Sequence, residues 1–211
     1  MNLIFKNKRE LIAACIDRDD VVLDVGFWGQ GVSAKDDNWV HKILRERAKD
    51  VWAFDLEYDE KRLPGPKKNY FIGDAENFAV DKKFDVIFAG DLIEHLSNPG
   101  LFLLQAKKHM KPGGKLILST PNAFNLFNLF EKISKREPTV NREHTCYFNS
   151  KTLSVLLERN GWKVDSVDFL YSLGVQYKES LKKKILNVLY KILSLFTSKF
   201  VETLVITATI K

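Results

Sequence analysis

The sequence has little cysteine: Cys15 and Cys146 are the two among 211 residues. They lack the spacing of a metal site and cannot form a disulfide framework, which indicates a reducing compartment, so we expect a cytoplasmic protein. No apolar run is long enough to span a bilayer. Residues 2–10 are polar and basic, without the long apolar core of a secretory signal. These absences leave an ordinary globular protein.

The composition is also that of an ordinary globular protein, with 45% hydrophobic and 28% charged residues. The length suits one domain, residues 1–211, with a sizeable core. The net charge of +6 permits an anionic partner without demonstrating one. Three consecutive lysines, Lys182, Lys183 and Lys184, indicate that the excess positive charge forms a local patch.

The chain is organised around residues 21–31, VVLDVGFWGQG. The apolar run Val21–Val25, interrupted only by Asp24, is typical of a parallel strand covered on both faces. A glycine-rich turn and a helix pattern over 33–49 follow. Strand, glycine turn and helix form the usual opening of a nucleotide-binding α/β sheet, although a tight turn without a ligand would look the same.

Further segments repeat this alternation, which predicts a parallel sheet with helical crossovers. Expected strands are 51–55, 69–72, 84–89, 115–120, 162–171 and 202–210; expected helices are 3–16, 99–110, 123–135, 150–160 and 178–200.

Four acids follow successive strand ends: Asp24, Asp55, Asp74 and Asp91. In a parallel sheet these ends share one edge, so the four carboxylates should face one crevice. A carboxylate after the second strand can accept both hydroxyls of a ribose. Each acid taken alone could instead cap a helix or lie in a solvated loop.

With these residues the sequence resembles the class I S-adenosylmethionine-dependent methyltransferases. The resemblance rests on VLDVGFWGQG, AFDLE, GDAENF, FDVIFAGDLIEHLSNPG, MKPGGKLILSTPN and REHTCYFN. The run 84–122 is especially similar to the branch with ubiquinone-biosynthesis O-methyltransferases. The implied fold is α/β: a Rossmann-like, seven-stranded, mostly parallel sheet with helices on both faces and an antiparallel C-terminal hairpin.

The resemblance implies S-adenosylmethionine as cofactor and S-adenosylhomocysteine as product. Asp55 would hold the ribose, Asp74 and Ala75 the adenine, and Asp91 would lie near the methionine end. The sequence departs from the family at Phe27-Trp28, which separates Gly26 from Gly29. The expected cofactor site comprises Asp24, Gly26, Phe27, Trp28, Gly29, Asp55, Leu56, Asp74, Ala75, Glu76, Gly90 and Asp91.

Methylation of a hydroxyl can need a base, and histidine is the usual one. His95 and His144 are the catalytic candidates, although His95 could simply orient its loop. His41 and His109 have charged neighbours, which favours surface positions. The set Asp91, Glu94, His95 and His144 is similar to one that holds a divalent ion in some relatives. We expect no metal here and keep the set as an alternative.

The expected acceptor is a small molecule, sugar or lipid-linked glycan methylated on a hydroxyl. Gly90-Asp91-Leu92-Ile93 lacks the prolines and aromatic typical of DNA N-methylation, so DNA is not expected. A catalytically inactive methyltransferase-like binding subunit is the alternative, supported by the disturbed glycine turn. A nicotinamide-dependent oxidoreductase is disfavoured because the turn lacks G-x-G-x-x-G.

Two later segments concern the acceptor and partners. Residues 123–148 include an aromatic helix that could form a lid over a ring-bearing acceptor or simply pack in the core. Residues 176–200 hold an inserted helix, apolar on most sides, with lysines at both ends. Burial or a dimer contact is the favoured interpretation of 178–200, and an interfacial helix on an anionic membrane is the other.

Overall fold

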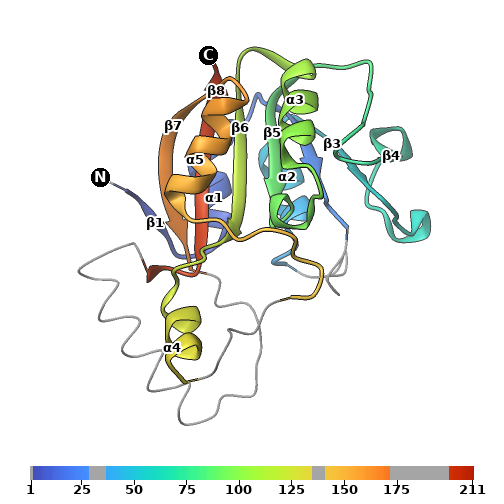
Figure 1. Cartoon of the computed structure of the whole chain (residues 1–211). Helices are drawn as coiled ribbons and strands as arrows, with labels where there is room; N and C mark the ends of the chain where they lie inside the picture. Colours follow the sequence, from blue (N-terminus) through green and yellow to red (C-terminus); the bar gives the residue numbers. More distant parts are fainter. Residues whose placement is uncertain (1, 29–36, 135–140, 172–199) are drawn as a thin grey trace.

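The computed structural model describes residues 2–28, 37–134, 141–171 and 200–211. Its eight strands form one sheet in the order β1-β7-β8-β6-β5-β2-β3-β4 (Figure 1). All neighbouring pairs are parallel except those of β8, which is antiparallel to both β6 and β7. The expected mostly parallel sheet with an antiparallel C-terminal pair is therefore confirmed.

Strands β2 to β8 lie close to the positions that the apolar runs predicted. Their bounds are β2 Val21–Val25, β3 Asp50–Asp55, β4 Tyr70–Ile72, β5 Phe84–Gly90, β6 Met110–Pro121, β7 Trp162–Leu170 and β8 Thr203–Ile210. Most residues of β2 and β5 are buried because helices cover both faces of the sheet. Strand β6 begins five residues earlier than expected, pairing Met110 with Phe84 before a shift in register.

The number of strands differs from the expected seven. The helix expected over 3–16 is instead a strand, β1 Ile4–Phe5, followed by α1 Lys8–Cys15. Strand β1 pairs in parallel with β7, and Asn7 caps α1 by accepting a hydrogen bond from the Glu10 amide. Two residues are too few to show an alternation in sequence, so this edge strand was missed.

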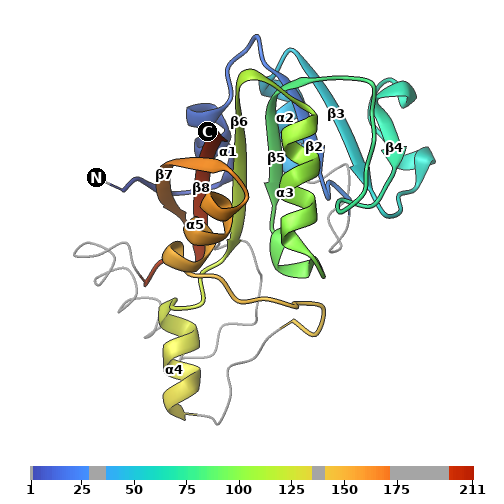
Figure 2. The same ribbon diagram turned by 45° about the horizontal axis from the view of Figure 1, so that its top comes forward.

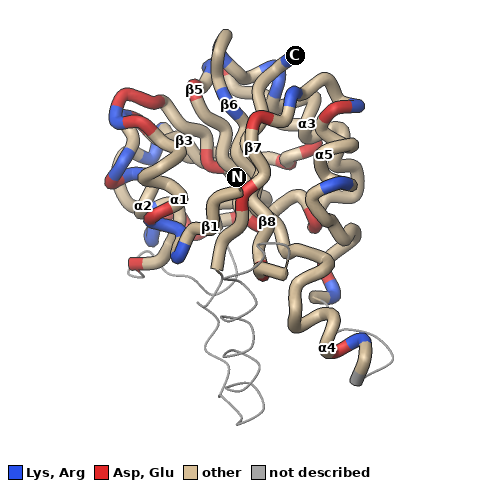
Figure 3. The backbone as a smooth tube through the Cα atoms, turned by 90° about the vertical axis from the view of Figure 1, so that its left-hand side faces the viewer, with Lys and Arg blue, Asp and Glu red and all other residues tan. Residues whose placement is uncertain are grey.

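The helices form a layer on each side of the sheet, as Figure 3 shows from the β1 edge. Helix α1 and α2 Val40–Arg47 pack on one face through Leu11, Ile12, Ile43 and Leu44. Helix α3 Pro99–Lys108 and α5 Ser150–Arg159 cover the other through Phe102, Leu103, Leu153 and Leu157. The helix expected over 33–49 is thus observed only as α2, and part of its range, 33–36, lies outside the described residues.

Helix α4 Leu126–Ser134 follows the carboxyl end of β6 and extends beyond that edge of the sheet (Figures 1 and 2). Phe124, Phe130 and Ile133 are exposed there. Most of the helix expected over 178–200 lies outside the described residues, as does 135–140 of the expected loop. No helix among those described has the length and apolar character needed to cross a bilayer.

Candidate functional site

A cavity of about 330 Å³ opens at the carboxyl ends of β2, β3 and β5. Nine residues predicted for the site line it: Asp24, Gly26, Phe27, Trp28, Asp55, Leu56, Gly90, Asp91 and His95. The strand ends therefore bring together three of the four acids, as the parallel arrangement predicted. Gly29 lies outside the described residues.

The first turn is shaped by one glycine and one buried aromatic. Gly26 has φ +74°, and a Cβ there would lie 3.0 Å from the Leu92 side chain, so the position favours glycine. Phe27 is buried among aromatic rings, 5.4 Å from Tyr70 and 6.2 Å from Trp39 between centroids. The departure from the family's glycine pattern thus places a core aromatic within the turn.

Asp55 is fixed at the end of β3 by the backbone around it. Its Oδ2 accepts a hydrogen bond of 2.8 Å from the Trp28 amide, and its Oδ1 accepts one of 2.8 Å from the Leu56 amide. Burial raises the pKa of Asp55, and the charge of Asp24 adds to the effect. A preoriented carboxylate at this strand end suits the two hydroxyls of a ribose.

The residues expected to hold the adenine are placed differently. Asp74, Ala75 and Glu76 follow β4 but are not among the residues that line the cavity. Asp74 accepts a hydrogen bond from the Glu76 amide, and Glu76 accepts two from Asn98 at the start of α3. The backbone bond from Asn98 is the main cause of a lowered Glu76 pKa. Their role towards an adenine remains a prediction.

Asp91 lines the cavity and contacts Lys8, the first residue of α1. Its backbone has φ +52°, a left-handed conformation that non-glycine residues seldom adopt. Its carboxylate lies 3.2 Å from the Lys8 ammonium and accepts a hydrogen bond of 3.2 Å from the Ser119 hydroxyl. Unusual backbone conformation at a residue that lines a cavity is common in functional sites.

Glu94, His95 and His144 form a compact group, here called the histidine cluster. One ligand atom of each lies within 4.8 Å of those of the other two, and the histidine rings meet edge to face at 4.6 Å. The loop bearing His144 is anchored by Thr145, whose amide donates to the Glu94 carbonyl at 2.8 Å and whose hydroxyl donates to the Leu96 carbonyl at 2.6 Å. The fold thus joins residues about fifty positions apart.

The histidine cluster is electrostatically unusual. Burial, with the charge of Asp91 adding to it, raises the pKa of Glu94 to about 7. Burial also lowers the pKa of His144, with a further contribution from His95. The Thr120 hydroxyl donates to Glu94 Oε2 at 2.8 Å. Within the described part of the chain, Glu94 Oε1 and His95 Nε2 are buried without a hydrogen-bond partner.

Two predictions about histidine were wrong. His41 is fully buried, and His109 is 7% exposed. His41 bonds Asp24 and Tyr70 through its two ring nitrogens, whereas the Val80 amide donates to His109 Nε2. Charged neighbours in the sequence do not indicate an exposed histidine here, because adjacent residues of a helix lie on different faces: Lys108 is exposed beside the buried His109.

Seven further residues line the cavity and were not predicted from the sequence: Lys8, Asn38, Trp39, Val40, Phe88, Leu92 and Glu143. Lys8 is the first residue of α1, and nothing in its local pattern indicates that α1 begins beside the cavity. Trp39 could have been found as an apolar residue just before a helix and near the glycine turn. It is buried and donates from its indole nitrogen to the Phe27 carbonyl at 2.8 Å.

The sheet order, the single antiparallel strand β8 and the acid-lined cavity together define a class I S-adenosylmethionine-dependent methyltransferase fold. The donor set suits that cofactor: the Asp55 carboxylate matches the ribose diol, and Asp24 and Asp91 line the same cavity. The fit therefore rests on residues present in the cavity.

Comparison with known proteins agrees. Residues 4–167 match the family described as "Methyltransferase domain", and the chain belongs to that family. A ubiquinone biosynthesis O-methyltransferase from Rickettsia conorii is 41% identical over 58 residues, 28% of this chain and 20% of that protein. A probable S-adenosylmethionine-dependent methyltransferase from Mycolicibacterium smegmatis is 28% identical over 163 residues, 74% of this chain and 56% of that protein. The chain therefore aligns with only part of these relatives.

A solved structure shows the same fold. The 1,6-didemethyltoxoflavin-N1-methyltransferase of Burkholderia thailandensis, with bound 1,6-didemethyltoxoflavin and S-adenosylhomocysteine, superimposes with a TM-score of 0.60. The match covers 97% of this chain and 76% of that chain at 17% identity. At this identity the likeness concerns architecture alone.

Proposed function

We propose that the protein transfers the methyl group of S-adenosylmethionine to a hydroxyl of a small-molecule, sugar or lipid-linked acceptor. The cofactor supplies a methyl group on a sulfonium, and its loss to a nucleophile leaves S-adenosylhomocysteine. The observation that carries the proposal is the histidine cluster: His95 lines the cavity, and the ring of His144 packs edge to face against that of His95.

In this proposal the histidine cluster removes the proton of the acceptor hydroxyl. A neutral ring is required of a base, and burial lowers the pKa of His144, which favours that form. His95 lies against the exposed carboxylate of Glu143, with His95 Nδ1 at 4.0 Å from it, so a proton taken up has a nearby counter-charge. Asp55 and Asp24 would meanwhile hold the cofactor.

Hydroxyl methylation is favoured over amine methylation by the ubiquinone-biosynthesis relatives, whose match is partial. The toxoflavin enzyme, an N-methyltransferase on the same fold, keeps an amine acceptor open. Fold alone does not decide between them. A base is more useful for a hydroxyl, because a neutral amine is already a good nucleophile, whereas a hydroxyl is a weak one until its proton is removed.

A second candidate role for the histidine cluster is binding of a divalent cation that would orient the acceptor oxygen. It is favoured by two buried atoms that have no hydrogen-bond partner among the described residues, Glu94 Oε1 and His95 Nε2. With a His144 nitrogen they offer mixed carboxylate and imidazole ligands, which suit Mn²⁺ or Zn²⁺ and, less readily, Mg²⁺. Asp91, the fourth residue of that candidate set, already contacts Lys8 and Ser119.

The proposal is tested in two stages. Calorimetric titration with S-adenosylhomocysteine first measures cofactor binding. Matched hydroxyl and amine acceptors are then incubated with S-adenosylmethionine, with EDTA or added Mn²⁺, and the methylated product is identified by mass spectrometry. Methylation confined to hydroxyls is expected, and methylation confined to amines would contradict the hydroxyl assignment. Binding without turnover on any acceptor would favour the inactive binding subunit.

A further inference from the structure

The imidazole of His41 bridges two polar groups inside the core. Its Nδ1 lies 2.9 Å from Asp24 Oδ2, and its Nε2 lies 2.9 Å from the Tyr70 hydroxyl. Residues from three elements, β2, α2 and β4, therefore meet at one fully buried ring. The rings of Phe27 and Trp39 pack on it with centroids 5.0 and 5.1 Å away.

The hydrogen-bond inventory at Tyr70 fixes the protons on this ring. The Tyr70 hydroxyl has one proton, and the Pro64 carbonyl at 2.6 Å can only accept it. Burial raises the pKa of Tyr70, which keeps the hydroxyl protonated. His41 Nε2 must then donate to the Tyr70 oxygen, and its Nδ1 faces a carboxylate that accepts. Both ring nitrogens therefore carry a proton.

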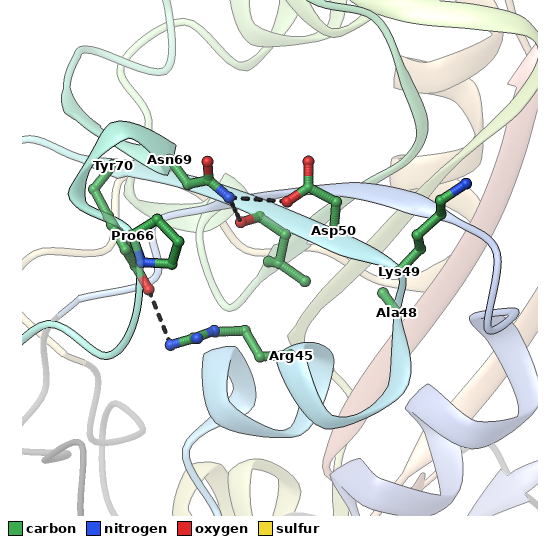
Figure 4. A pocket seen from close by; sticks show the side chains of 8 residues that line it. Arg45, Ala48, Lys49, Asp50, Pro66, Asn69 and Tyr70 are labelled. Carbon is green, nitrogen blue, oxygen red and sulfur yellow. Dashed lines mark hydrogen bonds between the residues drawn. The ribbon is translucent and has the colours of Figure 1, made fainter.

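The far end of this network reaches a second cavity, of about 220 Å³, lined by Arg45 and Tyr70 (Figure 4). The Arg45 guanidinium lies 3.4 Å from the Tyr70 hydroxyl and also donates to the Pro64 carbonyl. Tyr70 thus accepts from two cations and donates to a carbonyl, which leaves its oxygen fully used. A neutral His41 accepting from Tyr70 would leave the Pro64 carbonyl facing an oxygen without a proton.

We propose that His41 is a positioning residue for the cofactor cavity: as a buried imidazolium it holds the Asp24 carboxylate at the cavity wall. The inference rests on the proposed function, because Asp24 lines the cavity expected to take S-adenosylmethionine. Asp24 is only 2% exposed, and its charge adds to the effect of burial in raising the pKa of Asp55. Without His41 the buried Asp24 carboxylate would lose the N–H group that faces its Oδ2 and would be free to turn away from the cavity.

Substitutions of His41 can distinguish a hydrogen-bonding role of its side chain from a packing role. Three variants are titrated with S-adenosylhomocysteine: His41→Asn, His41→Gln and His41→Phe. The asparagine amide replaces the donor at Nδ1, which faces Asp24, whereas the glutamine amide reaches the Nε2 position, towards Tyr70. Phenylalanine fills the ring volume and donates nothing. The ring protons of wild-type His41 are read separately by nitrogen-15 NMR of the cofactor-free protein at neutral pH.

We expect the asparagine variant to bind within about threefold of wild type, and the glutamine and phenylalanine variants to bind about tenfold more weakly or worse. Should the phenylalanine variant not fold, the asparagine and glutamine pair still decides. Tighter binding by the phenylalanine or glutamine variant than by the asparagine variant, equal binding by all, or a neutral ring in the NMR spectrum overturns the proposal. Wild type that binds no S-adenosylhomocysteine contradicts the proposed function, while the NMR still tests the imidazolium.

Discussion

The β2–β3 side of the cavity and the histidine cluster differ in whether their buried polar atoms have hydrogen-bond partners. On the β2–β3 side, both oxygens of Asp55 accept backbone hydrogen bonds, and Asp24 is bonded to His41. In the histidine cluster, by contrast, Glu94 Oε1 and His95 Nε2 have no partner among the described residues. A satisfied network holds one geometry, whereas unused buried donors and acceptors favour something that binds there.

The strongest test of this contrast is the loss of a histidine. His144→Ala should lower kcat by about 10²- to 10⁴-fold, the usual contribution of a general base. The affinity for S-adenosylhomocysteine should not change, because His144 is not among the residues lining the cavity. Steady-state kinetics and calorimetry measure the two effects. Arg142→Ala, an exposed change in the same loop, is the control, and an equal loss there would remove His144 from the mechanism.

Asp55→Asn tests the other side of the comparison. The amide keeps one acceptor oxygen but loses the charge, so S-adenosylhomocysteine should bind about 10- to 100-fold more weakly. The kcat at saturating cofactor should change little, since the histidine cluster is intact. Calorimetry measures the affinity, with Asp81→Asn, an exposed acid outside the cavity, as control. An unchanged affinity would show that Asp55 does not hold the ribose.

The pH dependence of stability offers a third test, on metal-free protein in EDTA. Unfolded, Glu94 ionises near 4.5, but in the folded protein its pKa is about 7. Between these values the folded state keeps a proton that the unfolded state has lost, so stability falls as pH rises, by up to about 3 kcal/mol. Glu94→Gln should abolish that fall. Urea unfolding below and above this window measures it, and the same fall in wild type and variant would count against a buried, protonated Glu94.

The smallest effect is expected on α4. Phe130→Ser removes an exposed aromatic, 48% accessible, from the helix beyond the carboxyl ends of the strands. If α4 contacts an apolar acceptor, the acceptor KM should rise several-fold, roughly in line with the apolar area lost. Leu104→Ser, a similarly exposed apolar change on α3, should leave KM unchanged. A KM that responds equally to both would argue against acceptor contact by α4.

The sequence predicted the strands and the cavity acids better than it predicted the positions of the histidines. The central strands were predictable because burial on both faces leaves continuous apolar runs, and the three cavity acids because strand ends share an edge. The positions of His41 and His109 were not, because helix faces depend on tertiary packing rather than on charged neighbours. The resemblance to known methyltransferases was enough to predict Glu94, His95 and His144 as candidate site residues. Their proximity depends on Thr145 bonding to Glu94 and Leu96, which no local pattern encodes.

Strand β8 has a consequence for the order of assembly. It lies between β6 and β7 and pairs with both along most of its length, so among the described strands it alone joins the β1–β7 edge to the rest of the sheet. Its partner β6 precedes it by about ninety residues, which makes this closure a late, long-range event. Until residues 203–210 arrive, β6 and β7 present open edges to any other strand. During synthesis, β2 to β5 can pair before that, whereas the protein stays prone to edge-to-edge association until its final strand is in place.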